Sequence, residues 1–392
     1  MLLIKFFSVN HNSAMQTPIP TLLMRGGTSR GPFFVASDLP ADIPTRDRVL
    51  LSVMGSPDKR QIDGLGGANP LTSKVGIVSL SSTPGVDLDF LFAQLQPDKS
   101  SVDTTPNCGN MLAAVVPFAL ERGLIKAQGD TTTVRVLTLN TDMQCDVTVQ
   151  TPMTSNGRQM RYDGNAKIDG VPGSSAAITI NFLDTAGSVC SGLLPTGQVL
   201  NEIAVAPNDT LGGFTSFKLN VTCIDNGMPL VIFRASDLGC TGYESVDELN
   251  ANLDLKKRIE ALRIQTGHLM GLGDVSTKNY PKMTLISAPR NGGSLNTRSF
   301  IPHVCHDAIG VLAAVTVGTA CVLEGSIAQG IAQIPDGSAK VISVEHPTGE
   351  FSVELGLDPE NPQNVTRAAL LRTARLIMRG EVMIPDNIWT TS

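Results

Sequence analysis

Aromatic residues and basic clusters are scarce in this 392-residue sequence. Phe, Trp and Tyr together make up 4% of the residues, and only one of them is a tryptophan. The 30 lysines and arginines stand against 36 acidic residues, and they do not gather in runs. Nucleic-acid binding depends on basic patches and on rings that stack against bases. We therefore expect no nucleic-acid partner.

Paired cysteines are also missing. The seven cysteines are an odd number, and no CxxC motif occurs. This pattern favours free thiols in a reducing compartment over a disulfide framework, so we expect a cytoplasmic protein. Residues 1–14, MLLIKFFSVNHNSA, lack the positive start and long apolar core of a signal peptide. We expect them to be a disordered extension, with Met15 as the functional start.

No apolar run reaches the roughly 20 residues that a membrane-spanning helix needs. Residues 308–323 read AIGVLAAVTVGTACVL without a charge, and residues 109–124 read GNMLAAVVPFALERGL. In both segments apolar residues surround the helix axis, which is typical of a helix buried on all sides. The sequence therefore predicts two central helices wrapped by sheet and no membrane partner.

The length exceeds what one hydrophobic core usually supports, so we expect two domains. We place them at residues 15–190 and 191–380, with the tail 381–392 returning to the first domain as a strand. Many short apolar runs, punctuated by 37 glycines and 24 prolines, indicate a β-rich protein. Strands are expected at 21–24, 75–80, 133–137, 146–150, 177–182, 229–233 and 282–287. Helices are expected at about 46–54, 110–122, 246–266, 308–323 and 363–379.

Two stretches repeat one arrangement of reactive residues. Lys74 begins an apolar strand, and Cys108 later begins one of the apolar helices. In the second half Lys282 begins a strand, and Cys305 precedes the other apolar helix. A lysine beside a buried strand loses solvation, which favours the neutral amine that a base needs. A cysteine at a helix start is stabilised as thiolate, so Lys74 and Cys108 are the predicted catalytic pair.

Glycine-rich segments near this pair are candidates for substrate binding. Arg25-Gly26-Gly27-Thr28-Ser29 offers a carboxylate-binding guanidinium and a turn whose backbone can approach a ligand. Residues 27–31 also match GxSxG, but the strand-like PFFV that follows argues against a hydrolase elbow. Residues 64–69, GLGGAN, lack nucleotide-binding spacing. We expect Asn69 and Ser73, with Gly109 and Asn110 after the cysteine, to line the substrate site.

Polar residues of the second half complete the prediction. His303, Cys305 and His306 hint at a metal, but no second cluster supplies the four ligands of a closed zinc site. We therefore expect no metal, and we predict that His303 and His306 contact the substrate. Asn226, in a turn before an apolar strand, and Arg298, a second carboxylate clamp, are the remaining candidates.

The motifs MRGGTSRG, IDGLGG, LTSKV, NCGN, IDNGMP and SFIPHVCH, in this order, resemble the PrpF-type isomerases, relatives of diaminopimelate epimerase. The resemblance covers nearly all of residues 18–390. It implies an α+β fold of two similar domains, each a β-barrel-like sheet around a central helix. It also implies a lysine base at Lys74, a cysteine partner at Cys108 and no cofactor. Epimerases use a second cysteine, whose position here falls near Cys305-His306-Asp307 in an unfixed register, and the altered turn argues against racemase chemistry.

The implied activity is a cofactor-independent movement of a C=C bond by one carbon in an unsaturated tricarboxylate. We expect the substrate to be 4-oxalomesaconate from aromatic catabolism, with 2-methylaconitate or aconitate as the alternative. Two other classes stay open: a non-catalytic carboxylate-binding protein and a cysteine hydrolase. The expected partners are the small tricarboxylate and a second copy of the chain in a homodimer.

Overall fold

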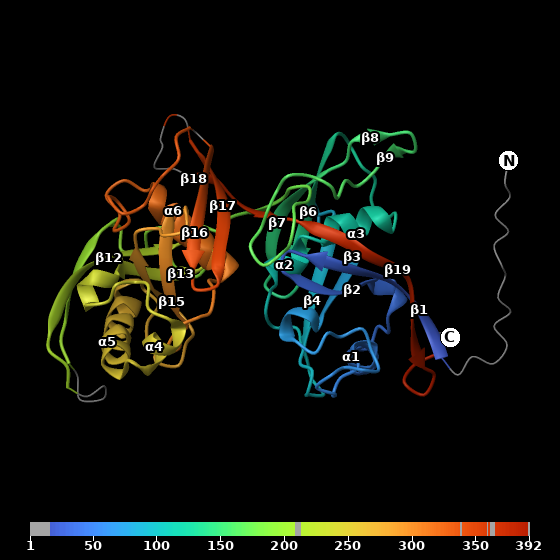
Figure 1. Ribbon diagram of the computed structural model, residues 1–392, viewed down its shortest axis with the longest axis horizontal. Helices are drawn as coiled ribbons and strands as arrows, with labels where there is room; N and C mark the ends of the chain where they lie inside the picture. Colours follow the sequence, from blue (N-terminus) through green and yellow to red (C-terminus); the bar gives the residue numbers. More distant parts are fainter. Residues whose placement is uncertain (1–15, 208–212, 338, 359, 361–364, 391–392) are drawn as a thin grey trace. The chain divides into compact units, whose positions relative to one another are not determined.

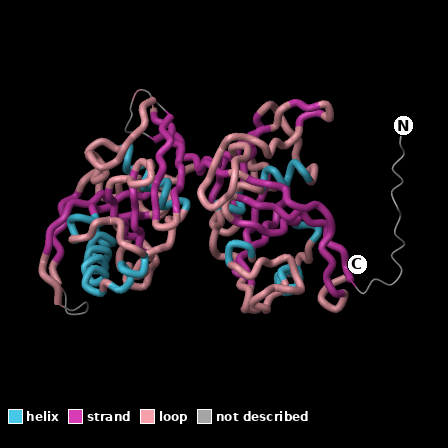
Figure 2. Tube along the Cα trace, viewed as in Figure 1, coloured by secondary structure: helices cyan, strands magenta, loops and turns pink. Residues whose placement is uncertain are grey.

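The protein contains more strand than helix, which confirms the predicted α+β class (Figure 2). The computed structural model describes residues 16–207, 213–337, 339–358, 360 and 365–390 (Figure 1). The predicted extension 1–14 lies outside these residues. None of the helices within them is long and apolar enough to cross a membrane.

The chain divides into two compact units. The first unit takes the residues up to Ala127, then Val136–Asp142, and then the chain from Ala374. The second unit takes Gln128–Arg135 and Met143–Thr373. The domain boundary expected at residue 190 therefore falls inside the second unit, because β7 (Met143–Gln150) pairs with β10 (Ile178–Phe182) and β10 pairs with β18 (Val365–Arg372).

The sheet of the first unit has a helix layer on each face. Its strands are β1 (Gln16–Gly26), β2 (Ser29–Val35), β3 (Lys74–Leu80), β4 (Leu88–Leu95), β5 (Val102–Asp103), β6 (Thr131–Thr138), which straddles the unit boundary, and β19 (Ala374–Pro385). Successive residues of a strand point to opposite faces. Phe34 of β2 joins the core beneath α1 (Ile43–Met54), whereas Phe33 stacks at 5.6 Å on Phe118 of α3 (Val115–Glu121).

The second unit packs its sheet around α6 (Val311–Val322). This helix contacts β12 (Phe217–Asp225), β13 (Pro229–Arg234), β16 (Ala339–His346), β17 (Gly349–Leu357) and β18. Its residues 313–321 are all buried, as the uniformly apolar sequence predicts. The remaining elements are β8 (Met153–Thr154), β9 (Gly157–Arg158), β11 (Asn201–Val205), α4 (Val246–Ala251), α5 (Leu253–Leu269), β14 (Lys282–Ser287) and β15 (Leu295–Phe300).

Strand pairing repeats from one unit to the other. β1–β2 and β12–β13 are antiparallel, β2–β3 and β13–β14 are parallel, and β3–β4 and β14–β15 are antiparallel. After the second strand of each set the chain reads FVASDL (34–39) or FRASDL (233–238), and a 3₁₀ turn begins at the alanine of each. Lys74 and Lys282 are each the first residue of the third strand. The two lysines are therefore structural counterparts.

Two predicted helices differ from the structure in instructive ways. The helix expected at 110–122 is divided into α2 (Gly109–Leu112) and α3. The division precedes Pro117, which cannot donate a hydrogen bond to the carbonyl of Ala113 and crowds that carbonyl. Asn252 likewise divides the helix expected at 246–266, capping α5 through a bond from the Leu255 N–H.

The helix expected at 363–379 is wrong. Residues 365–372 form β18, residues 374–385 form β19, and residues 363–364 lie outside the described part of the chain. Alanine, leucine and arginine favour a helix in isolation, but β18 pairs with β10 and β17, and β19 pairs with β1 along its length. Tertiary hydrogen-bond partners overrode the local propensity. The expected return of the tail corresponds to β19, which begins earlier than residue 381.

A glycine on β2 allows the strands around Lys74 to approach closely. A Cβ built on Gly31 would lie 1.8 Å from the carbonyl oxygen of Lys74, whereas a Cβ on Gly380 of β19 would meet nothing within 4 Å. Both glycines pair with β1, at Met24 and Thr21. We expect Gly31→Ala to lower the free energy of unfolding by about 1–3 kcal/mol through overpacking. Gly380→Ala should leave it unchanged or raise it by about 0.4–1 kcal/mol.

Urea denaturation of the two variants and the wild-type protein measures this difference. The midpoint of Gly31→Ala should move to lower urea, and that of Gly380→Ala should not. Equal midpoints for the two variants would show that β2 can move away from Lys74 without loss, contrary to the close packing described above.

Candidate functional site

Lys74 is a buried lysine at the first position of β3. Its side chain belongs to a residue only 8% exposed, and its Nζ lies 4.8 Å from the centre of the Phe92 ring. The same Nζ donates a hydrogen bond of 2.6 Å to Oε1 of Gln94. Both partners come from β4, and Gln94 is the cross-strand partner of Lys74. The amine is thus held between a ring face and a neutral acceptor, and no carboxylate of the described residues is bonded to it.

The loop before Lys74 is shaped by the residues predicted to line the site. Oδ1 of Asn69 accepts a bond from the Leu71 N–H at 2.8 Å and caps a 3₁₀ turn at 70–72. The buried hydroxyl of Ser73 lies 2.8 Å from both Oε1 of Gln61 and the carbonyl oxygen of Asn69. Ser73 therefore fastens the loop, and Asn69 caps its turn. The sequence reasoning missed Gln61, whose role follows only from contacts made across the loop.

Cys108 is the half-buried N-cap residue of α2. Asn107 orients it: Oδ1 of Asn107 accepts the Cys108 N–H at 2.8 Å, and Nδ2 donates to Thr138 at 3.2 Å and to Thr141 at 3.4 Å. Gly109 follows as the first residue of α2. Because α2 has four residues, the dipole of a long helix, which the sequence led us to expect at the thiol, is not available in full.

The elements that carry Lys74 and Cys108 are tied together within the first unit. Asn140 exchanges hydrogen bonds with the backbone of Phe92 at 2.9 and 2.8 Å and donates to the carbonyl of Thr104 at 2.7 Å. It thereby joins the strand beneath the Lys74 amine to the segment that leads into Cys108.

The second unit repeats the arrangement of a strand-start lysine and a helix cap. There the N-cap of α6 is Gly310, and a Cβ on Gly310 would lie 3.5 Å from Nζ of Lys282. Lys282 is the counterpart of Lys74, and both Gly310 and Cys108 cap the buried helix that packs on the repeated strands. The two lysines and the two helix caps thus occupy corresponding positions in the repeat.

The turn at Gly26–Ser29 packs against the start of α2. Gly27 has a φ of +52°, and a side chain there would collide with Oδ1 of Asn110 at 2.1 Å. Nδ2 of Asn110 donates to Oγ1 of Thr28 at 3.0 Å. Among the described residues, Oδ1 of Asn110 and Oγ of Ser29 are buried without a hydrogen-bond partner.

Arg25 stands in a row of arginines. It is paired with Arg30 across β1–β2 and with Arg375 across β1–β19. Its Nη1 donates to the carbonyl of Gly27 at 2.9 Å, and burial, followed by the charge of Arg375, lowers its pKa. Strand alternation puts Arg30 and Gly31 on opposite faces of β2. The structure therefore does not bring Arg25 to the face where Gly31 adjoins Lys74, and its action as a carboxylate clamp stays a prediction.

The candidates of the second unit are largely engaged in structure. The Asn226 amide accepts from Thr185 at 2.5 Å and donates to Thr319 at 2.8 Å. Arg298 donates to the Glu244 and Thr297 carbonyls and to Oδ1 of Asn296, at 2.8–3.0 Å, and burial lowers its pKa. These hydrogen bonds occupy both ends of the Asn226 amide and the Nε and Nη1 atoms of Arg298, groups that the sequence analysis assigned to substrate binding.

The HVCH motif holds a buried thiol between two histidines. Cys305 is buried well before α6 begins, and burial raises its pKa to about 11. His303 is exposed and lies 3.4 Å from Glu260, and Nδ1 of His306 accepts the Ala308 N–H at 2.8 Å. Burial and then Lys282 lower the pKa of His306. Within the described ranges no three His, Cys, Asp or Glu side chains are placed to hold a metal ion.

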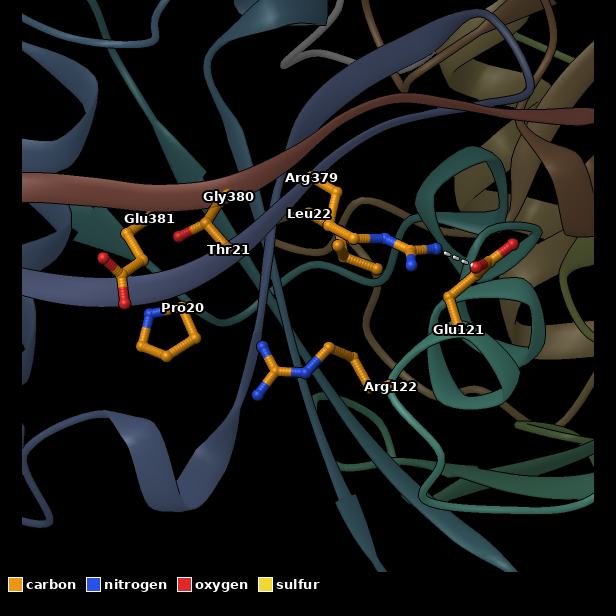
Figure 3. Close-up of a pocket in the computed structure, with 8 residues that line it drawn as sticks. All are labelled: Pro20, Thr21, Leu22, Glu121, Arg122, Arg379, Gly380 and Glu381. Atoms are coloured by element: carbon orange, nitrogen blue, oxygen red, sulfur yellow. Dashed lines mark hydrogen bonds and ion pairs between the residues drawn. The ribbon is translucent and has the colours of Figure 1, made fainter. Parts of the chain in front are cut away.

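A hollow of about 380 Å³ in the first unit is a different feature (Figure 3). It lies among Pro20, Thr21, Leu22, Glu121, Arg122, Arg379, Gly380 and Glu381. Glu121 pairs with Arg379, and Arg122 pairs with Asp38 at 2.9 Å. None of the predicted site residues lines it, and most of its charges are already matched. It is not the candidate active site.

Comparison with known proteins identifies the group to which these motifs belong. The sequence profile of the PrpF protein family matches residues 16–385. The chain belongs to the PrpF family. The family predicted from the motifs is thereby confirmed.

Individual relatives of this PrpF protein cover nearly its whole length. It is 52% identical over 374 residues to 4-oxalomesaconate tautomerase of Pseudomonas putida, covering 95% of this chain and 98% of that one. It is 52% identical over 365 residues to (4E)-oxalomesaconate Delta-isomerase of a Novosphingobium species, covering 93% and 97%. The crystal structure of a methylitaconate-delta-isomerase shares 32% identity with a TM-score of 0.81, covering 97% of this chain and 98% of that one.

Thiol reactivity should single out Cys108. Burial raises the pKa of Cys190, Cys223 and Cys321 to about 12 and also raises the pKa of Cys145 and Cys240. A thiol with a pKa of about 12 is only about 0.01% thiolate at pH 8, and thiolate is the form that alkylates. We expect iodoacetamide to label Cys108 first in the folded protein, as read by peptide mass mapping.

The matched control is Cys240→Ser, which removes another half-buried thiol and should leave the fast phase intact. Cys108→Ser should abolish that phase. Faster labelling of Cys190 or Cys240 than of Cys108 would contradict the assignment of Cys108 as the reactive thiol.

Proposed function

We propose that this PrpF protein is a cofactor-independent allylic isomerase that converts 4-oxalomesaconate to its tautomer. The observation that carries the proposal is the buried Lys74 amine, whose partners among the described residues are the neutral Gln94 and Phe92. Asn140 joins the strand of these partners to the segment that leads into Cys108. The names of two relatives at 52% identity supply the substrate. The neutral amine is the form of lysine that acts as a general base, and a carboxylate partner would favour the ammonium form.

The proposed reaction moves one proton out and one proton in. Lys74 removes a proton from the carbon next to the C=C bond, and the electron pair delocalises into a dienolate over the neighbouring carboxylate or keto oxygens. Cys108 then donates its thiol proton to the far carbon of the allylic unit, so that the double bond has shifted by one carbon. Net composition is unchanged, and the proton that Lys74 gained returns to Cys108 through solvent. The two roles can be exchanged within the same balance.

The turn beside Cys108 supports the binding of a polar ligand. A buried oxygen without a partner costs about 1–3 kcal/mol. Oγ of Ser29 and Oδ1 of Asn110 are two such oxygens from predicted substrate-binding residues. The enol or hydroxyl group of a keto acid can donate to either oxygen, and the Ser29 hydroxyl can in turn donate to a carboxylate. This use of Ser29 and Asn110 is part of the proposal.

Three further expectations belong to the same proposal. Each unit is proposed to close as a barrel-like sheet around its buried helix, an idea supported by the five strands that contact α6. The ligand is proposed to be the tricarboxylate itself, bound in the cytoplasm without a metal. A homodimer is proposed as the assembly, and light scattering behind a sizing column would measure it.

The alternative substrates are 2-methylaconitate and aconitate, which the same lysine and thiol could isomerise. Purified protein offered each acid separately, with ultraviolet absorbance followed over time, distinguishes them. We expect the highest kcat/KM with 4-oxalomesaconate. Turnover of 2-methylaconitate or aconitate with a higher kcat/KM would transfer the proposal to that acid. Binding without turnover of any acid would favour a carboxylate-binding protein.

Removal of the amine should abolish the chemistry and preserve the fold. We expect Lys74→Met to lower kcat by about 10²–10⁴-fold, the usual contribution of a general acid or base. Cys108→Ser should reduce kcat by a similar factor, because a hydroxyl transfers a proton far less readily than a thiol. Lys99→Met, at an exposed lysine, is the matched control and should retain wild-type activity.

Proton NMR in heavy water measures both turnover and exchange at the two carbons. Wild-type protein should incorporate deuterium at the carbon that is reprotonated, and Lys74→Met should not. Normal turnover by both Lys74→Met and Cys108→Ser, with circular dichroism unchanged, would refute the mechanism.

A further inference from the structure

Gln94 is bonded at both ends of its side-chain amide. Its Oε1 accepts the Lys74 ammonium at 2.6 Å. Its Nε2 donates towards the carbonyl oxygens of Pro70 at 3.1 Å, Ser73 at 3.1 Å and Leu95 at 2.9 Å. The antiparallel register of β3 and β4 sets Gln94 directly across from Lys74. These hydrogen bonds therefore fix the Gln94 side chain beside the amine.

The three carbonyl groups decide which end of the amide faces Lys74. A carbonyl oxygen accepts hydrogen bonds and cannot donate them, so only the NH₂ group of Gln94 can face them. A flipped amide would set its own oxygen against three acceptors and its NH₂ against the ammonium. The orientation with Oε1 towards Lys74 is therefore the favourable one.

A neutral acceptor has a specific consequence for a lysine that must change its charge. Oε1 can accept a hydrogen bond from the ammonium or from the neutral amine, so the side chain keeps its place in both protonation states. A carboxylate in the same position would stabilise the ammonium by a charge interaction and oppose proton release. The Phe92 ring face, 4.8 Å from Nζ, attracts the cation but carries no net charge.

We propose that Gln94 is a positioning residue for Lys74: it aims the amine and holds it in place in both protonation states. This inference deepens the proposed function and rests on it for the role of Lys74. Gln94 makes no contact with the reacting atoms in this argument and acts through Lys74. Its bonds to Pro70 and Ser73 also tie β4 to the loop that precedes Lys74, so the test must separate orientation from simple support.

Two substitutions change the environment of the amine in opposite senses. Gln94→Glu places a carboxylate at the acceptor position and should move the Lys74 titration to higher pH by about 1–3 units. Gln94→Met removes the acceptor while keeping a side chain of similar length, and should move it to lower pH. Glu also sets an oxygen against the three carbonyls and lowers stability, so Met is the variant expected to fold more readily.

The pH dependence of kcat/KM reads the titration during turnover. In this profile, the limb set by Lys74 should move to higher pH in Gln94→Glu and to lower pH in Gln94→Met. This holds whether the lysine acts as base or as acid. If lysine is the base this is the acidic limb, and if lysine is the acid it is the alkaline limb. A merely supporting residue would lower activity in both variants without moving the limb. Gln150→Glu makes the same chemical change on β7 and should leave the limb in place.

A second readout does not need turnover. Protein labelled with ¹³C at lysine Cε is titrated by NMR, and the Lys74 signal is assigned by its loss in Lys74→Arg. Opposite displacements of the Lys74 titration in Gln94→Glu and Gln94→Met support the positioning role, whether or not 4-oxalomesaconate is a substrate. Lack of turnover of 4-oxalomesaconate would count against the proposed function alone. An unchanged Lys74 midpoint in a folded Met variant, or displacement of both variants in the same direction, overturns the role of Gln94.

Discussion

The parallel pairing of β2 with β3 is the constraint on which the site depends. It brings Lys74 against Gly31 so closely that a Cβ would meet the lysine carbonyl at 1.8 Å. On the other side, β3 pairs with β4, where Gln94 accepts a hydrogen bond from the Lys74 amine and the Phe92 ring face lies beside it. A lysine placed in this way loses water, and its surroundings are set by strand geometry rather than by a flexible loop.

The two units share their strand pairing but differ in the residue at the start of the buried helix. Lys282 pairs across from Leu230 as Lys74 adjoins Gly31, yet the helix start beyond it carries Gly310 where the first unit has Cys108. Cys305 lies before the helix as a buried thiol with a pKa of about 11. Of the two helix caps, only the first presents a thiol. This asymmetry fits a lysine–cysteine pair better than the opposed cysteines of an epimerase.

The predicted site residues differ in whether their polar groups find partners within the protein. Asn226 and Arg298 are bonded to neighbouring backbone and side chains, and a buried group engaged in this way stabilises its surroundings. Ser29 and Asn110, in contrast, keep buried oxygens without partners among the described residues. Predictions based on residue type treated all four alike, because a sequence records which groups are polar but not which partners they find.

Residue order alone was enough to identify the α+β class, the apolar helix of the second unit and the PrpF family, and it proposed the pair Lys74 and Cys108, which stays a prediction. These features depend on local composition and on motifs that lie close together in the chain. Strand partners decided the rest: β18 and β19 arise from a helix-favouring segment, and the neighbours Gln61, Gln94, Asn140 and Arg375 come from distant positions. Hydrogen bonds between strands join residues without regard to their separation in sequence, so no local pattern could have revealed these contacts.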